Sequence, residues 1–416
     1  MKYHAFNFLK NIYYVRTAGS ENDLKAAIEI KEEVKRLGGE AIFEEFLVDH
    51  STITEAKLIV DGKEIECAGS GYSGITPKEG ITGDFYYAEQ LESIGLVNLK
   101  DKIILSATKR VPHDLYEKAV KDCALGFILI TGSVYKKNSD VDLDPYLNRE
   151  LDYTLGKIPT VMIRAKDAEK ILEKEPKKAT IILNGIDDKI KTQNVVSKIE
   201  GTDFKDEIIT LTAHYDSVCY SKGAYDNATG VISLLHLYDY FIQNKPKRTL
   251  KFIWCGAEEM GLLGSKNYVK THEDEIKNNV VLNINIDMVA ATIGRDIACV
   301  TGDNSIVNYL KFMYKEEGFS LHVYQDVYSS DSTPFADMGI PAISFARISG
   351  PNGAVIHCHD DVIERLSEPN FLRTMDFIIK LLNRWANASQ FPIEKKMPQE
   401  MKDKIDKYYQ RKKEEK

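Results

Sequence analysis

Several features common in other protein classes are missing from this sequence of 416 residues. No stretch approaches the ~20 consecutive apolar residues that a membrane-spanning helix needs. The segment from Met1 to Lys10 has no long apolar core and no small-residue cleavage site, so we do not expect a signal peptide. The sequence therefore predicts a cytoplasmic protein that has no membrane partner.

Cysteine pairs and basic charge are also scarce. There are 6 Cys, none in a C-x-x-C pair, and several lie in apolar runs as reduced core thiols do. Lys and Arg number 55 against 63 Asp and Glu, which gives a net charge of −8. This balance argues against nucleic acid as the main partner, because such binding needs a basic face. A composition of 43% hydrophobic and 28% charged residues excludes disorder as a global description.

The chain is too long for one hydrophobic core, since chains beyond roughly 250–300 residues usually split into several units. Residues 53–187 alternate short apolar runs with turn signals and predict a compact α+β unit. From residue 194 onward, buried strands alternate with longer helices, which predicts a mainly parallel sheet covered by helices on both faces. Residues 392–416 carry 9 Lys/Arg and 6 Asp/Glu, and we interpret them as a solvated helix or a frayed terminus.

The apolar patterns also place individual elements along the chain. Strands are expected at 41–48, 102–107, 126–131, 159–164, 208–213, 250–255, 280–286 and 341–346. Helices are expected at 24–37, 114–123, 167–173, 230–241, 262–272, 305–317 and 369–385.

Potential metal ligands lie at the ends of three expected strands and in the neighbouring loops. They are His214, Asp216, Asp226, Glu258, Glu259, Asp287 and the run His357-Cys358-His359-Asp360-Asp361. In doubly wound sheets, ligands bind at the carboxyl ends of the strands. So many acids in one place would be costly without a cation, because like charges repel and buried charges lose solvation. The pattern therefore predicts a divalent metal site.

The types of candidate ligand indicate which metal ions the site would bind and which kind of reaction it would catalyse. Imidazoles and carboxylates without clustered thiols suit zinc, cobalt or manganese better than magnesium or calcium, and a shared carboxylate is usual in two-metal sites. Adjacent residues that leave a strand point in different directions. One acid of the Glu258-Glu259 pair can therefore bind metal while the other serves as a general base.

These residues together resemble the co-catalytic dizinc aminopeptidases, a family that includes glutamate carboxypeptidase II, the glutaminyl cyclases and the transferrin receptor ectodomain. Five motifs carry the resemblance, in family order: His214-Tyr-Asp216, Asp226-Asn-Ala-Thr-Gly230, Glu258-Glu259-Met-Gly-Leu-Leu-Gly-Ser265, Asn285-Ile-Asp287 and Ile356-His-Cys-His-Asp-Asp361. The resemblance implies two zinc ions, with cobalt or manganese as possible substitutes.

The resemblance also implies a role for each position. Asp226 would bridge the two metals, His214 and Asp287 would complete one zinc site, and Glu259 and His357 the other.

Glu258 would be the general base, and Asp216 would orient His214 from outside the ligand set. His357 rather than His359 fits the family spacing, which leaves His359 as a rim residue. Tyr324 and Tyr328 are candidates for stabilising the oxyanion.

The fold implied is the α/β zinc-exopeptidase type, a mainly parallel mixed sheet sandwiched by helices. The catalytic domain would be discontinuous, formed by 1–52 and 188–391, with a charged C-terminal tail at 392–416. Residues 53–187 would be an inserted α+β/β domain, which resembles a protease-associated domain through the segments 99–105, 119–131 and 158–163. Residues 329–335 resemble a substrate-side loop, although Ser332 stands where family members often have His.

The activity implied is that of a zinc-dependent aminopeptidase that acts on peptides with a free N-terminus, using a metal-bridging water and Glu258. A metallo-carboxypeptidase of the same family is an alternative, with Arg347 as a cation for the C-terminal carboxylate. A glutaminyl cyclase-like transferase, with one zinc, and a non-catalytic binding module are further alternatives.

Overall fold

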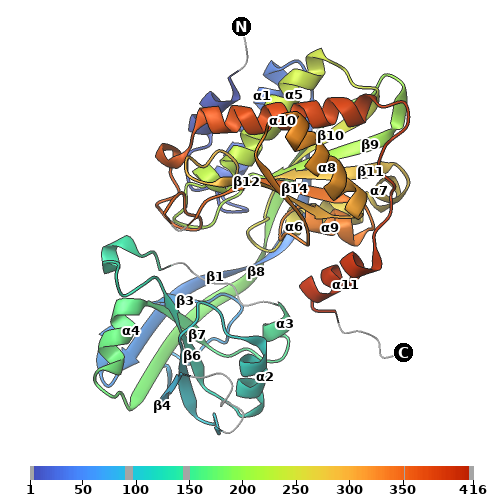
Figure 1. Ribbon diagram of the computed structural model, residues 1–416. Coiled ribbons are helices and arrows are strands. Elements are labelled where there is room, and N and C mark those ends of the chain that lie inside the picture. The colour runs from blue at the N-terminus through green and yellow to red at the C-terminus, as the bar shows by residue number, and fades with distance from the viewer. Residues whose placement is uncertain (1–3, 90–96, 144–149, 351, 412–416) are drawn as a thin grey trace. The chain divides into compact units, whose positions relative to one another are not determined.

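The computed structural model describes residues 4–89, 97–143, 150–350 and 352–411. The chain divides into two compact units (Figure 1), unit 1 formed by 1–47 and 191–416 and unit 2 by 48–190. Unit 1 is thus discontinuous in sequence, and unit 2 is an insertion in it.

The strands are β1 (Ala41–Val60), β2 (Lys63–Ile65), β3 (Ala68–Gly69), β4 (Ile81–Ala88), β5 (Lys102–Ser106), β6 (Gly126–Thr131), β7 (Thr160–Arg164), β8 (Lys178–Ile199), β9 (Phe204–His214), β10 (Arg248–Cys255), β11 (Val280–Ile286), β12 (Arg295–Thr301), β13 (Leu321–Gln325) and β14 (Ala342–Ile348). The α-helices are α1 (Glu21–Arg36), α2 (His113–Lys121), α3 (Glu150–Tyr153), α4 (Ala165–Leu172), α5 (Thr229–Gln243), α6 (Leu263–Thr271), α7 (Glu273–Asn278), α8 (Asn304–Glu316), α9 (Ser332–Asp337), α10 (Glu368–Asn387) and α11 (Gln399–Tyr408). Shorter helical turns cover Ala5–Asn11, Asn138–Asp140, Ala224–Ala228 and Ile363–Arg365.

The sheet of unit 1 has the strand order β13-β12-β14-β11-β9-β10-β8. The central strands β14, β11, β9 and β10 are parallel, while β8 and β12 each run antiparallel to a neighbour. Because the central strands are parallel, their carboxyl ends lie at one edge of the sheet. This confirms the mixed, mainly parallel α/β sheet expected from the sequence.

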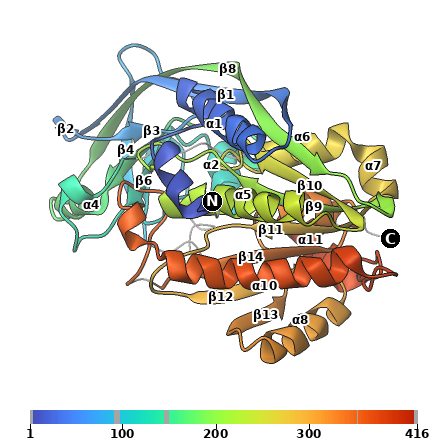
Figure 2. The same ribbon diagram turned by 90° about the horizontal axis from the view of Figure 1, so that it is seen from above.

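Helices cover both faces of this sheet because its strands are apolar on both sides. Leu250, Phe252 and Trp254 of β10 pack in the cluster that includes α1, α5, α8 and α10. Ile253 and Cys255, which point the other way, pack with α6, α7 and α9. Helices α5 and α10 contact one another on the first face (Figure 2).

The buried face of α1 includes small residues as well as large ones. Ser20 caps it by accepting a hydrogen bond from the Asp23 N–H, 3.1 Å away. Its buried apolar residues are Ala26, Ala27, Ile30 and Val34, whereas Leu24 and Ile28 are each more than 40% exposed. Two small alanines let the helix approach the rest of unit 1 closely.

Unit 2 has its own core around the strand order β8-β4-β5-β6-β7-β3, in which β4 to β7 are parallel. Ile103 and Leu105 of β5 pack on the side of α4, and Ile104 packs on the side of α2. In the described part of the chain, no helix combines the length and the apolar character needed to cross a membrane.

The charged C-terminal segment does not match the expected solvated or frayed terminus. Met401 and Ile405 of α11 are buried in a cluster with Ala336 and Ala342. Arg411 donates to both carboxylate oxygens of Asp337, each over 2.6 Å. The charged side chains of α11 lie mostly on its exposed side. Met401 and Ile405 lie on the opposite side and are buried.

Candidate metal centre

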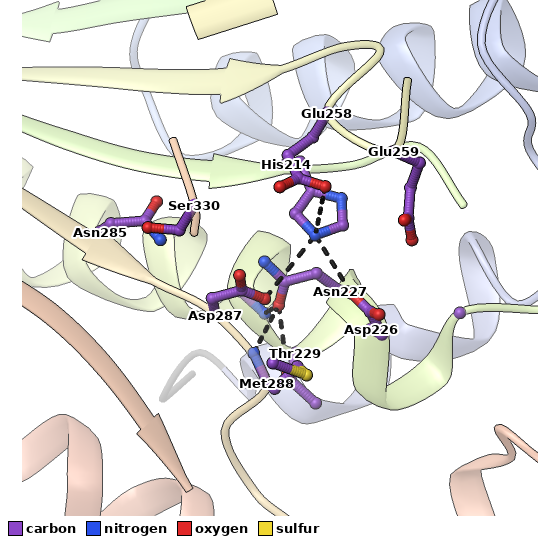
Figure 3. Close-up of polar contacts among 12 residues, drawn as sticks. His214, Asp226, Asn227, Thr229, Glu258, Glu259, Asn285, Asp287, Met288 and Ser330 are labelled. Carbon is purple, nitrogen blue, oxygen red and sulfur yellow. Dashed lines mark hydrogen bonds and ion pairs between the residues drawn. The ribbon is translucent and has the colours of Figure 1, made fainter. Parts of the chain in front are cut away.

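The predicted ligands come together at the carboxyl edge of the unit 1 sheet (Figure 3). His214 ends β9, Asp287 follows β11, and Glu258 and Glu259 lie between β10 and α6. Asp226 lies in the turn before α5, and His357 lies between β14 and α10. The parallel strands explain this convergence, because each delivers its C-terminal residues to the same edge.

Asp226 lies between the two histidines. Its Oδ1 is 3.1 Å from Nε2 of His214, and its Oδ2 is 3.1 Å from Nε2 of His357. Nε2 of His214 is also 3.6 Å from Oδ1 of Asp287, and Nε2 of His357 is 3.0 Å from Oε2 of Glu259. Two of the three groups of donor atoms share Asp226, one with His214 and Asp287 and one with Glu259 and His357, and the third joins His214 to Glu258 and Glu259.

Glu258 lies beside both groups, with its Oε2 3.9 Å from Nε2 of His214. The buried carboxylate of Asp216 accepts hydrogen bonds from the backbone N–H groups of Glu258 (3.0 Å) and Glu259 (3.2 Å). Its Oδ1 is also 3.5 Å from Nδ1 of His214. Asp216 therefore connects the end of β9 to the loop that carries both glutamates.

The D-N-A-T-G motif acts through the backbone as well as through Asp226. Asn227 Oδ1 accepts hydrogen bonds from the N–H groups of Gly230 (2.8 Å) and Met288 (3.1 Å), and Asn227 Nδ2 donates to the Ile286 carbonyl (3.1 Å). A side chain at Gly230 would lie 2.4 Å from the Ile286 oxygen. The motif therefore joins the Asp226 turn to the end of β11, next to Asp287 (Figure 3).

Asp361 stabilises the turn that carries Asp226. Its buried carboxylate accepts hydrogen bonds from the N–H groups of Tyr225 (2.6 Å) and Asp226 (3.1 Å). Burial raises the pKa of Asp361 to about 6. The sequence contained a signal for this residue, its place in the motif that begins with Ile356, but pattern alone gave it no role.

The electrostatics of the centre favour a bound cation. Burial raises the pKa values of Glu258 and Asp287, and burial with the charge of Asp226 raises that of Glu259 to about 7. Against the effect of burial, hydrogen bonds to Asp226 and Glu259 raise the pKa of His357 to about 11. In the described structure, buried Glu259 Oε1 and Asp287 Oδ1 have no hydrogen-bond partner. Buried carboxylate oxygens without a hydrogen-bond partner, next to imidazole nitrogens, fit a divalent metal such as zinc.

The two tyrosine candidates differ in position. Burial, followed by the charge of Asp287, raises the pKa of Tyr328. Burial and Cys299 raise that of Tyr324, which belongs to the edge strand β13 and pairs with β12. The charge of Asp287, a predicted ligand, acts on Tyr328 but is not among the causes for Tyr324, so Tyr328 is the candidate that the electrostatics favour.

The segment 329–335 is less open than its resemblance to a substrate-side loop implied. The side chains of Ser330, Asp331 and Ser332 are buried. The Ser330 and Ser332 hydroxyls lie 3.0 and 2.8 Å from that of Ser344 on β14. A hydroxyl network, rather than solvent, surrounds this part of the chain, and the small serine at 332 fits into it.

His359 and Arg347 lie apart from the donor groups. His359 is partly exposed, with Nε2 3.6 Å from Oδ1 of Asp360. Arg347 is nearly buried, and its guanidinium donates to Asp296 Oδ2 (2.6 Å) and to the Ala291 carbonyl (2.7 Å). Arg347 is thus occupied by a structural ion pair and is not presented to a substrate carboxylate.

Comparison with known proteins agrees with this arrangement. Residues 194–382 match the model of peptidase family M28. The chain is 28% identical over 375 residues to aminopeptidase YwaD of Bacillus subtilis, covering 87% of this chain and 79% of that protein. It is 34% identical over 140 residues to the vacuolar membrane protease of Saccharomyces cerevisiae, but this match spans only 14% of that longer protein.

Solved structures show the same fold. An aminopeptidase from Aneurinibacillus sp. strain AM-1 superposes with a TM-score of 0.74 at 25% identity, over 94% of this chain and 95% of that one. A zinc aminopeptidase from Bacillus subtilis superposes with a TM-score of 0.76 at 24% identity, over 96% of this chain and 98% of that one.

Proposed function

Because the stretch 194–382, which carries every residue of the candidate metal centre, belongs to peptidase family M28, we propose that this protein is a zinc-dependent aminopeptidase. It removes the N-terminal residue from peptides. The observation that carries the proposal is the position of Asp226, whose two oxygens each lie 3.1 Å from a different histidine beside Glu258. The aminopeptidases named among the relatives support it.

Two zinc ions fit the two donor groups. His214, Asp226 and Asp287 would hold one, and Asp226, Glu259 and His357 the other. Bound zinc lowers the pKa of a water molecule and polarises the scissile carbonyl. Cobalt and manganese accept the same donor types and are possible substitutes.

Glu258 is the general base. It takes a proton from the attacking water and then delivers that proton to the leaving amine. Burial raises its pKa, which suits a carboxylate that must accept a proton near neutral pH. Asp216 holds its backbone N–H in place, and the hydroxyl of Tyr328 donates to the oxygen that becomes negative in the transition state.

The same geometry favours an aminopeptidase over a carboxypeptidase. A carboxypeptidase needs a cation for the C-terminal carboxylate, and Arg347 is already paired with Asp296.

A panel of aminoacyl and N-blocked peptide substrates, assayed with added zinc or cobalt, tests the proposal. We expect cleavage of substrates with free N-termini only, lost on chelation and restored by metal. Cleavage of N-blocked peptides from the C-terminal end would replace the proposal with a carboxypeptidase. The cytoplasmic location and the likeness of unit 2 to a protease-associated domain stay predictions from the sequence.

A further inference from the structure

The N-terminal segment of the chain contributes a fully buried arginine, Arg16, beside the metal centre. Its guanidinium donates to five backbone carbonyl groups, those of Ile12, Tyr14, Tyr215, Lys222 and Gly223. Carbonyl oxygens are neutral, and within the described residues Arg16 makes no ion pair. Burying a charged group without an ion-pair partner costs free energy. We therefore expect the hydrogen bonds of Arg16 to have a structural role.

Three of these carbonyls belong to segments that carry metal ligands. Nε of Arg16 donates to Tyr215, the residue that follows His214. Nη2 donates to the carbonyl of Gly223 over 2.8 Å, and Nη1 to that of Lys222 over 2.5 Å, in the turn that leads to Asp226. One rigid, planar group thus holds the end of β9 and the Asp226 turn at a fixed separation.

The backbone around Arg16 reinforces this connection. Its own N–H donates to Ser217 Oγ (3.1 Å), and its carbonyl accepts from the Ser217 N–H (3.3 Å). A side chain at Gly223, which has a φ of +54°, would lie 2.8 Å from Arg16 Nη2. The chain is therefore built to let the guanidinium reach the Gly223 backbone.

A second set of contacts reaches Tyr215 from the other side. The buried Asp23 accepts hydrogen bonds from Thr192 Oγ1 (2.8 Å) and Gln193 Nε2 (3.3 Å). Gln193 Nε2 lies 2.6 Å from the hydroxyl of Tyr215. The segment from Arg16 to Asp23 thus holds both the backbone and the ring of the residue between His214 and Asp216.

We infer that Arg16 is a positioning residue for the metal centre. Its guanidinium sets the separation of the His214 and Asp226 donor atoms, which lie 3.1 Å apart, by holding the carbonyls of Tyr215 and Gly223. The inference rests on the proposed metal centre, and it assigns part of that centre to a segment outside residues 194–382.

Arg16→Lys and Arg16→Gln separate positioning from charge. Lysine keeps the charge but lacks the planar fork, and glutamine loses the charge. If Arg16 acted mainly through charge, glutamine would bind zinc more tightly than wild type, since a nearby cation repels the metal. Positioning instead predicts that both variants weaken zinc binding, by roughly tenfold or more.

The measurement is the zinc dissociation constant by competition with a chelator, together with the rise in Tm on adding zinc to metal-free protein. Arg248→Lys is the matched control, because Arg248 is also fully buried and donates to the carbonyls of Trp385 and Ala388, at the far end of β10. We expect it to lower Tm without changing zinc affinity.

Wild-type zinc affinity in both Arg16 variants would overturn the inference, as would an equal loss in Arg248→Lys. If neither Arg16 variant folds, Ser217→Ala gives a milder perturbation, because it removes the acceptor of the Arg16 N–H. It should weaken zinc binding severalfold, and unchanged affinity would count against the inference. These readouts do not depend on which substrate is cleaved, so a failed peptidase assay would leave them interpretable.

Discussion

The backbone N–H of Glu258 donates a 3.0 Å hydrogen bond to the buried carboxylate of Asp216. This contact joins the end of β9 to the loop after β10, so the proposed base is held by the strand that also carries His214. Catalysis and metal binding therefore share their supports but use different side chains, and the two functions can be separated by substitution.

Glu258→Gln should bind zinc as wild type does but hydrolyse peptides roughly 10²–10⁴-fold more slowly, because it removes the proton acceptor and no proposed ligand. Metal analysis alongside kcat checks this. Glu259→Gln is the contrasting variant, expected to lose zinc as well as activity. Normal turnover by zinc-replete Glu258→Gln would remove Glu258 from the role of base.

His357→Ala should lower the zinc content from about two ions per chain to about one, since His357 belongs to only one donor group. Asp226→Ala should affect both ions because both groups contain Asp226. Elemental analysis of dialysed protein measures the stoichiometry. A wild-type value near one would instead favour the cyclase-like alternative.

Asp23→Asn should change how stability depends on pH. Burial raises the pKa of Asp23 from 3.8 to about 6, so the folded state holds this proton more tightly than the unfolded state does. The stability that Asp23 contributes is thus present below pH 3.8 and is lost as the pH rises to about 6. Relative to Asp23→Asn, wild type should lose up to about 3 kcal/mol of unfolding free energy over this range. Urea unfolding at several pH values measures the difference, and Glu21→Gln, an exposed acid in the same turn, should show none.

Met401→Ala should destabilise the protein by about 2–5 kcal/mol, because the side chain of Met401 on α11 is fully buried. The exposed neighbour Lys402→Ala should change stability by about 0.5 kcal/mol or less. Equal unfolding curves for the two variants would instead indicate that the C-terminal segment is solvated, as its charges predict.

Arg347→Met should cost about 3–5 kcal/mol, since it leaves Asp296 buried without its partner. Substrate preference should not change, because Arg347 does not contact the substrate. The exposed Arg295→Met is the control for stability. A selective loss of binding for substrates with a free C-terminal carboxylate would revive the carboxypeptidase alternative.

The sequence predicted the central elements well, because their apolar runs are long and end in clear turn signals. The strands at 126–131 and 280–286 match β6 and β11 residue for residue. Strand β8 was missed over most of its length, since its middle residues are polar and exposed and carry no alternating pattern. The edge strand β13 and its neighbour β12 were also missed, because short apolar runs do not distinguish a strand from a helix.

The candidate ligands, the base and the support Asp216 were predicted through residues with distinctive chemistry, but the supports Arg16 and Asp361 were not. His214, Asp226 and Glu258 stand out by type and by position at strand ends. Arg16 and Asp361 act through backbone carbonyl and N–H groups, which any sequence contains. Only the fold shows which backbone groups they reach.

The interrupted order of the chain has a consequence for synthesis on the ribosome. Unit 2 is continuous from 48 to 190, and its core needs no residue of unit 1's later part. Helix α1 is made first, but Ala26 and Val34 pack against segments beyond residue 195. Unit 2 can therefore fold while α1 still lacks its partners, and Arg16 reaches the carbonyls of Tyr215, Lys222 and Gly223 only after the insert has been completed. Limited proteolysis of ribosome-bound chains of increasing length would reveal this order, with protection of the insert preceding protection of the N-terminal helix.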